Sequence, residues 1–107
     1  MREIKFRAKC KLKDKLMFGS YRLSGGKHYI NSTEIYRETL GQFTGFKDKN
    51  GVDVYEGDII QTINNKFVAD LHYSTLFHLE HYSRLVEVIG NIYETPDLFV
   101  KKKLEEE

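Results

Sequence analysis

Apolar and basic side chains alternate without interruption near the start of the chain. Between residues 4 and 13, every even position is apolar and every odd position is Lys or Arg. A β-strand sends successive side chains to opposite faces, so this alternation predicts a half-buried strand with one basic, solvent-facing side. Such a strand either deters edge-to-edge pairing or binds phosphates and other acids, and the sequence leaves both interpretations open. The predicted basic stripe consists of Lys5, Arg7, Lys9, Lys11 and Lys13.

The stretch KDKNGVDVYEGDII at residues 47–60 gathers acidic and amide side chains around two glycines. A two-residue Asn-Gly loop would place Asp48 directly opposite Asp53, where like charges repel. A three-residue loop at residues 49–51, closed by glycine in the left-handed region, instead places Lys47 opposite Asp53. We therefore predict the three-residue loop, with the Asp48 side chain accepting hydrogen bonds from backbone N–H groups of the turn.

Known site motifs do not match these acidic residues. An EF-hand loop that begins at Asp48 requires an acid or amide at its fifth position, glycine at its sixth and glutamate at its twelfth. The chain has Val52, Asp53 and Ile59 there. A Walker A loop, a dinucleotide fingerprint, HExxH and GxSxG are all absent from the sequence. We therefore predict no catalytic residue, no enzymatic activity and no cofactor.

Two glycines predict a hairpin in the first half of the chain. Ser24-Gly25-Gly26 lies between strands expected at residues 16–23 and 27–30, and glycine supplies the positive φ that a tight turn needs. Residues 31–41 are expected to be irregular or to form a brief strand, although Ser32 or Thr33 could cap one helical turn.

Residues that favour turns also occur in the second half of the chain. Glu56-Gly57-Asp58 predicts a turn before the apolar pair Ile59-Ile60. Gly90, within the last expected strand, indicates a bulge or a close backbone approach. Thr95-Pro96-Asp97 combines a capping residue, a proline and an acid, which predicts the start of a short C-terminal helix.

Alternating apolar side chains at residues 66–80 predict a further hairpin, with residues 74–76 as its loop. In this register His72 faces His78, and Asp70 faces Glu80, on the polar side of the two strands. Two imidazoles and two carboxylates at this distance could share a divalent metal ion, but a solvated face with ordinary histidines is the favoured interpretation. No metal site is assigned.

These short elements predict a mainly β protein, an antiparallel sheet curled into a small barrel or roll with a short C-terminal helix. An SH3-like barrel is the specific candidate. The 107-residue length fits a single domain at residues 1–100, followed by a charged tail at residues 101–107. Cys10 is the sole cysteine and is expected to be a buried thiol. The apolar runs are too short for a membrane span or signal peptide, so we expect a cytoplasmic protein.

The function indicated by these patterns is recognition of a macromolecule. The net charge of +1 gives no general reason to expect nucleic acid, whereas the basic stripe does. Tyr29 and Tyr55, together with Tyr21, could stack on bases beside that stripe, although packing in the core is the commoner use of such tyrosines. Nucleic-acid binding is slightly favoured. The alternative is a protein-interaction or self-assembly module, including a homo-oligomer.

Three blocks of the sequence resemble the YopX-like family of phage and prophage proteins from Gram-positive bacteria. The blocks are IKFRA at residues 4–8, TGFKDKNGVDVYEGDII at residues 44–60 and EVIGNIYETPDL at residues 87–98. The resemblance implies a small, mainly β protein encoded by a phage or prophage, and it implies no catalytic residue. Together with the basic stripe and the missing catalytic motifs, it leads us to predict a non-enzymatic accessory or regulatory protein in a bacterial host. Family members commonly continue FRA with tryptophan and an acid, where this chain has Lys9-Cys10. The turn residues that match the family motif are Gly45, Asp48, Asn50, Gly51, Tyr55, Glu56, Gly57 and Asp58.

Overall fold

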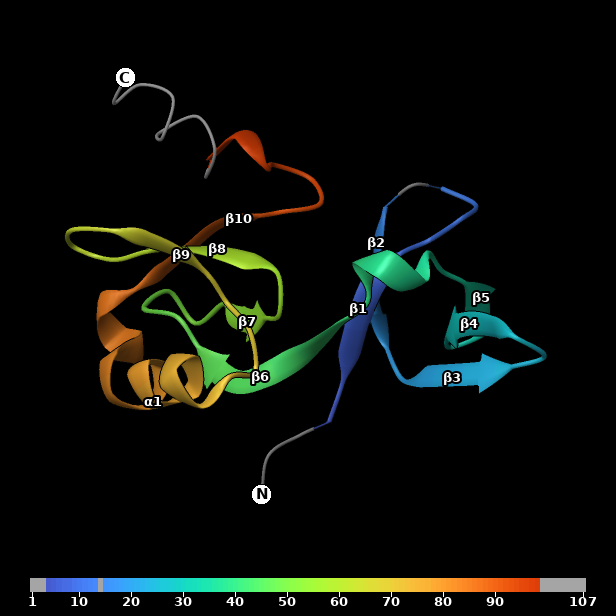
Figure 1. Ribbon diagram of the computed structural model, residues 1–107, viewed down its shortest axis with the longest axis horizontal. Coiled ribbons are helices and arrows are strands. Elements are labelled where there is room, and N and C mark those ends of the chain that lie inside the picture. The colour runs from blue at the N-terminus through green and yellow to red at the C-terminus, as the bar shows by residue number, and fades with distance from the viewer. Residues whose placement is uncertain (1–3, 14, 99–107) are drawn as a thin grey trace. The chain divides into compact units, whose positions relative to one another are not determined.

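The computed structural model describes residues 4–13 and 15–98. The chain divides into two compact units, Met1–Phe43 (unit 1) and Thr44–Glu107 (unit 2). Figure 1 colours unit 1 from blue to green and unit 2 from green to red. The family resemblance runs through both units, and the prediction of one domain at residues 1–100 stays a prediction.

Unit 1 consists of short antiparallel strands. β1 pairs with β2 on one side and with the start of β6 on the other, while β4 pairs with both β3 and β5. The β3–β4 hairpin turns at Gly25 and Gly26, which both have positive φ, so the predicted turn is confirmed. The strand expected at residues 16–23 is divided into two strands, of which β2 pairs with β1 and β3 with β4. The elements are β1 (Phe6–Lys9), β2 (Leu16–Gly19), β3 (Tyr21–Ser24), β4 (Lys27–Ile30), β5 (Thr33–Glu34), the 3₁₀ turn η1 (Arg37–Thr39) and β6 (Gly41–Lys47).

The core of unit 1 forms around one face of β1. Ala8, Ile30 and Ile35 are buried there, and Phe6 and Met17 pack against them. Of the even positions predicted to face the core, Phe6, Ala8 and Cys10 do so, whereas Ile4 and Leu12 are 72% and 83% exposed, so the prediction is wrong at both ends of the stretch.

The strand itself is shorter than the alternation indicated. β1 ends at Lys9, and residues 11–13 form a turn. The Cys10 N–H donates to the Lys15 carbonyl at 2.9 Å, and the Leu12 N–H donates to Cys10 Sγ at 3.3 Å. Hydrogen bonds that close a turn thus replace the strand ladder, and the extended conformation predicted for Lys11 and Lys13 is wrong.

Residues 31–41 contain both structures considered for them. β5 is the brief strand, and η1 is a single helical turn that begins after Tyr36, so neither Ser32 nor Thr33 caps it. The Thr39 hydroxyl ties η1 to β1, because it accepts from the Lys9 N–H at 2.8 Å and donates to the Tyr36 carbonyl at 2.6 Å.

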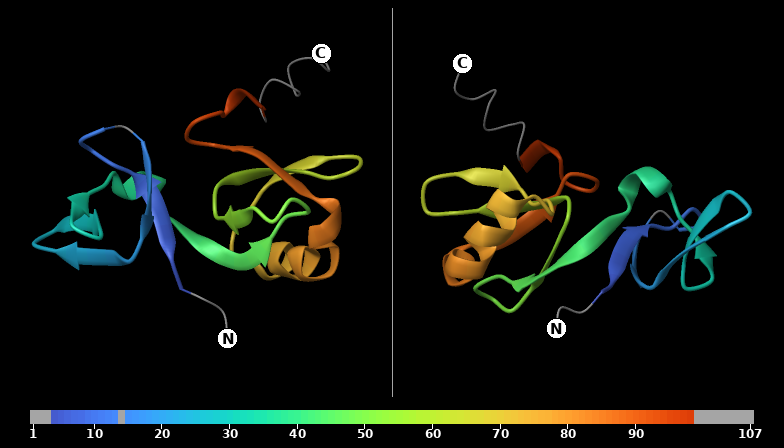
Figure 2. Two further views of the ribbon diagram at one scale, coloured as in Figure 1. Left: turned by 180° about the vertical axis from the view of Figure 1, so that it is seen from behind. Right: turned by 60° about the horizontal axis from the view of Figure 1, so that its bottom comes forward.

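Unit 2 combines β-strands with the one α-helix in the described part of the chain. β8 lies between β9 and β10, and the end of β6 is the neighbour of β7; Figure 2 shows these strands from two further sides. The core consists of Val54, Ile60, Ala69, Leu79 and Val86. The elements are β7 (Asp53–Tyr55), β8 (Asp58–Gln61), β9 (Lys66–Val68), α1 (Tyr73–Tyr82), η2 (Ser83–Leu85) and β10 (Glu87–Asn91).

Helix α1 corrects the hairpin predicted at residues 66–80. Only the first strand of that hairpin exists, as β9, and it pairs with β8. Leu79 is fully buried, while Tyr73 and Phe77, which the expected hairpin would place on its apolar face, are 77% and 48% exposed. Tyr73, Phe77 and Leu79 share one face of a strand but not of a helix, so the local alternation misidentified the buried side.

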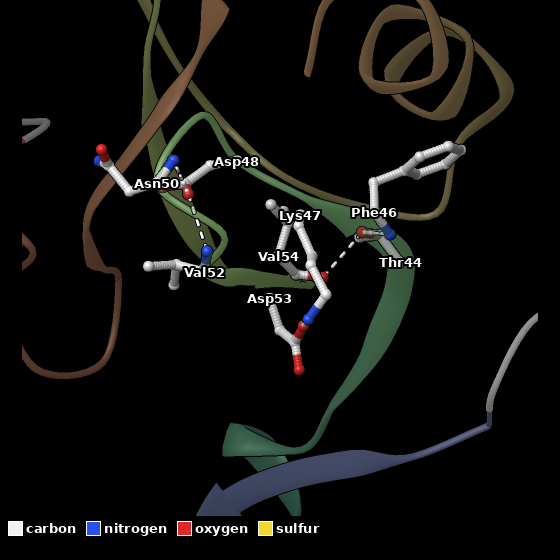
Figure 3. A network of polar contacts seen from close by, with 8 residues as sticks. All are labelled: Thr44, Phe46, Lys47, Asp48, Asn50, Val52, Asp53 and Val54. Carbon is white, nitrogen blue, oxygen red and sulfur yellow. Dashed lines mark hydrogen bonds and ion pairs between the residues drawn. The ribbon is translucent and has the colours of Figure 1, made fainter. Parts of the chain in front are cut away.

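The turn after β6 has the geometry predicted from its charges (Figure 3). The Asp48 N–H donates to the Val52 carbonyl at 2.8 Å, which leaves a three-residue loop that ends at Gly51 with φ +81°. Lys47 Nζ lies 2.6 Å from Asp53 Oδ1, so the predicted pairing is confirmed. Thr44, which is fully buried, donates its hydroxyl to the Val54 carbonyl at 2.7 Å.

The Asp48 carboxylate accepts more hydrogen bonds than the turn itself supplies. Oδ1 accepts from the N–H groups of Asn50 and Val52 at 2.8 and 2.9 Å, and Oδ2 accepts from the Val88 N–H in β10 at 2.9 Å. The Lys49 N–H donates to the Val86 carbonyl at 3.0 Å. With Asp48 only 6% exposed, these bonds attach the turn to a strand 40 residues away in sequence.

The second predicted turn is also confirmed. The Tyr55 N–H donates to Asp58 Oδ2 at 2.7 Å, and Asp58 is 1% exposed. Gly57 adopts φ +92°, and a Cβ there would lie 2.8 Å from the Tyr93 ring. Glycine is therefore required at this position both by its backbone conformation and by space.

Gly90 shows both features expected of a glycine within a strand. The β10–β8 register shifts between Val88 and Gly90, which is a β-bulge. A Cβ on Gly90 would lie 2.1 Å from Thr95 Oγ1. Asp97 and Leu98 are helical, and the remainder of the predicted C-terminal helix and the tail at residues 101–107 lie outside the described residues.

The mainly β class is confirmed, because the strand pairings of both units are antiparallel and the described chain has one short α-helix. The narrower SH3-like assignment is not confirmed. No helix among the described residues is long and apolar enough to cross a membrane.

Replacing Asp48 should destabilise unit 2 strongly. Asp48→Ala removes the acceptor of three backbone N–H groups, and we expect the free energy of unfolding to fall by about 2–4 kcal/mol. Urea denaturation followed by circular dichroism measures the change. The stability of Asp48→Asn should lie between that of the parent protein and that of Asp48→Ala, because the amide keeps one oxygen that accepts hydrogen bonds. The exposed control Asp97→Ala should stay within about 0.5 kcal/mol of the parent; equal effects at positions 48 and 97 would contradict the anchoring role.

Gly90→Ala should lower the free energy of unfolding by about 1–3 kcal/mol, because its new methyl group overlaps the Thr95 hydroxyl. In the double variant with Thr95→Ala the loss should be smaller than the sum of the two single losses. Thermal unfolding of the four proteins gives the comparison, and strictly additive losses would show that the close approach is not the cause.

Candidate nucleic-acid interface

Charge is distributed unequally between the two units. Unit 1 has ten Lys and Arg against four Asp and Glu, a net charge of +6, whereas unit 2 has seven against twelve, a net charge of −5. The two values add to the +1 of the whole chain. The near-neutral total thus conceals a strongly basic unit, which is the electrostatic property expected of a phosphate-binding surface.

The basic stripe predicted on β1 is not a continuous exposed surface. Arg7 is 5% exposed and Ala8, on the other face of the strand, is fully buried, so both faces of β1 are covered. Lys9 is half-buried, and Lys5 Nζ lies 4.5 Å from the centre of the Phe43 ring. The prediction that Arg7 faces solvent is wrong, because alternation along one strand does not show whether other parts of the chain cover its charged face.

The exposed lysines of the predicted stripe are Lys11 and Lys13. They belong to the connection from β1 to β2, whose course Figure 1 shows. We call Lys11, Leu12, Lys13 and Lys15 the basic turn; Asp14 is not among the described residues. Lys11 pairs with Glu34 at 2.9 Å. This hydrogen bond raises the pKa of Lys11 and lowers the pKa of Glu34, so each group favours the charged form of the other.

Lys13 and Lys15 differ from Lys11, Lys47 and Lys49, which each have a carboxylate partner. Both are exposed, and neither forms an ion pair with any residue that the structure describes. By contrast, Lys47 pairs with Asp53, and Lys49 lies 3.8 Å from Glu87. Within the part of the chain that the structure describes, no carboxylate pairs with Lys13 or Lys15; Asp14, between them in sequence, lies outside that part.

Further exposed cations of unit 1 were missed by the sequence analysis. Lys15, Lys27 and Arg37 are exposed and form no ion pair within the described chain, and Arg22 lies over the Tyr29 ring at 4.7 Å. Counting charges for residues 1–43 separately would have indicated them, because this segment holds ten of the seventeen basic residues.

One of the tyrosines predicted to stack on bases is buried. Tyr55 is 4% exposed, so it belongs to the interior of unit 2, and its assignment to a binding surface is wrong. Tyr29 is half-buried, with the Arg22 guanidinium over its ring. Tyr21 is also half-buried, and its hydroxyl forms a hydrogen bond with His28 Nδ1.

The metal constellation considered in the sequence does not form. His72 caps the N-terminus of α1 and accepts from the Ser74 N–H, whereas His78 lies within the helix with its ring edge-on to Phe67 at 5.5 Å. Asp70 Oδ1 accepts from the His72 N–H at 2.9 Å, and Glu80 is exposed on the helix. Within residues 4–13 and 15–98, no three His, Cys, Asp or Glu side chains are placed to hold a metal ion.

The remaining motif residues are not all in turns. Gly45, predicted to be a turn residue, lies instead within strand β6, where it adopts φ +95°. Asn50 belongs to the first turn, and its Nδ2 lies 3.5 Å from Glu87 Oε2. Glu56, half-buried, precedes Gly57 in the second turn. Together with Asp48, Gly51 and Asp58, these residues shape the backbone of unit 2, which is consistent with a motif that specifies folding.

Comparison with known proteins agrees with the architecture. A family model described as "YopX protein" matches residues 3–100. The crystal structure of protein EF1440 from Enterococcus faecalis is similar, with a TM-score of 0.50 and 24% sequence identity over 92% of this chain and 99% of that one. This likeness shows the fold alone. No curated protein matches the sequence. Because the family match spans both units, the chain belongs to the YopX protein family.

Proposed function

We propose that this chain is a non-enzymatic accessory or regulatory protein of a phage or prophage, and that it binds nucleic acid in the host cytoplasm through unit 1. The observation that carries the proposal is the net charge of +6 on residues 1–43. Membership of the YopX family supports the phage origin. The binding surface differs from the one predicted on β1, because it centres on Lys13 and Lys15 of the basic turn.

Lys13 and Lys15 are suited to bind phosphate because no described carboxylate pairs with them. An ammonium group that already has a carboxylate partner must give it up, or share it, when a phosphate binds. Lys13 and Lys15 have no such partner among the described residues, so none of the ion pairs found there has to break when a phosphate binds them. Each lysine that neutralises a phosphate also releases condensed counterions, which makes the affinity depend on salt.

A protein-interaction or self-assembly role is the second candidate, and helix α1 favours it. Tyr73 and Phe77 are 77% and 48% exposed, and their ring centres lie 6.1 Å apart on the outer side of the helix. Tyr82 is 48% exposed at the end of the same helix. Exposed aromatic side chains are typical of protein interfaces, and an apolar contact between proteins at this surface would persist at high salt.

Fluorescence anisotropy with labelled single- and double-stranded DNA and RNA tests the leading proposal. We expect micromolar or tighter binding at about 50 mM salt that weakens steeply at about 200 mM. The double variant Lys13→Ala/Lys15→Ala should bind more weakly. Because up to two phosphate contacts are lost, the slope of the logarithm of the binding constant against the logarithm of the salt concentration should be shallower by about 1–2.

The matched control is Lys49→Ala, which removes an exposed lysine of unit 2 and should leave the affinity unchanged. No binding at either salt concentration would refute the proposed function. Binding that Lys49→Ala weakens as much as the double variant does would refute its location in unit 1.

A further inference from the structure

A cavity of about 230 Å³ lies in unit 1 beside the basic turn. Its walls come from three parts of the unit: the turn itself, β2 and β5. The lining residues are Cys10, Leu12, Lys13, Lys15, Met17 and Thr33. None of the functions discussed so far uses this cavity.

Its lining combines an apolar interior with a cationic rim. Cys10 is 3% exposed and Met17 is half-buried, so thiol and thioether groups form the inner wall. Lys13 and Lys15 are both exposed on the rim and lack ion-pair partners among the described residues. A ligand that fits must present an uncharged, largely apolar group to the inside and negative charge to the outside.

Leu12 is a second observation that indicates a ligand. Its side chain is 83% exposed, although it lies between two lysines in sequence and contributes to the cavity wall. An apolar side chain held in water at the mouth of an apolar cavity gains free energy when a ligand covers it.

We propose that this cavity accepts one unpaired base of a single-stranded nucleic acid, while Lys13 and Lys15 contact the adjacent phosphates. A base offers a flat ring for Leu12 and Met17, and polar edges for the Thr33 hydroxyl. In a duplex the bases are stacked and paired, so the cavity confers a preference for single strands. This inference deepens the proposed nucleic-acid binding and rests on it.

An abasic oligonucleotide separates base binding from phosphate binding. Anisotropy is measured with labelled oligothymidylate and with an abasic strand of the same length, which carries the same phosphates without bases. We expect the abasic strand to bind about tenfold more weakly, a difference of about 1.4 kcal/mol. Duplex DNA of equal length should also bind more weakly than oligothymidylate.

Variants of exposed leucines locate the base contact. Leu12→Ala should weaken binding of oligothymidylate several-fold and leave binding of the abasic strand unchanged. Leu23→Ala is the matched control, because Leu23 is also exposed in unit 1, at 59%, and does not line the cavity. Both side chains lie largely in water, so neither substitution should unfold the protein.

Cys10 provides an independent reporter, since it lines the cavity and is the single cysteine of the chain. Its alkylation by iodoacetamide, followed by mass spectrometry, should slow when oligothymidylate binds and should not slow with the abasic strand.

The outcomes distinguish the cavity from the proposed function. Equal affinities for oligothymidylate and the abasic strand, both reduced by Lys13→Ala/Lys15→Ala, would overturn the base-binding inference and leave phosphate binding in place. Absence of binding to either strand would overturn both proposals. Equal losses for Leu12→Ala and Leu23→Ala would show that the base does not contact the cavity.

Discussion

The buried carboxylate of Asp48 is the interaction on which the order of unit 2 depends. A charge at 6% exposure is tolerated only if hydrogen bonds replace its lost hydration, and three backbone N–H groups do so here. Two of these groups belong to the turn after β6, and the third belongs to Val88 in β10. The carboxylate is therefore satisfied only when the turn and β10 are both in place, which couples local turn formation to closure of the core around Val54 and Val86.

The family motif of the central stretch consequently has a structural explanation. Asp48 and Asp58 accept backbone hydrogen bonds, while Gly51 and Gly57 adopt positive φ. These positions leave the motif with little exposed chemistry of its own. The proposed nucleic-acid contact is assigned to unit 1, where Lys13 and Lys15 are exposed and the net charge is positive. The two units thus differ in the sign of their net charge.

The sequence predictions succeeded where local chemistry decides the structure and failed where burial decides it. The charge conflict between Asp48 and Asp53 selected the correct loop length, and Gly90 correctly indicated the bulge of β10. The alternation at residues 66–80 also fits a helix that buries Leu79, and nothing local distinguishes the two. The basic alternation likewise located the inward face of β1 but could not show that Arg7, on the other face, is covered as well.

The sequence by itself determined the turns, the mainly β class and the family of this protein. Turns follow from neighbouring residues, because a positive φ or a side-chain acceptor is specified within a few positions. The tertiary structure alone decided that residues 73–82 are helical and that Tyr55 is buried. It also decided that Lys13 and Lys15 flank an apolar cavity. These outcomes depend on which surfaces pack together over long sequence separations, and a residue's own neighbours in the chain do not encode that information.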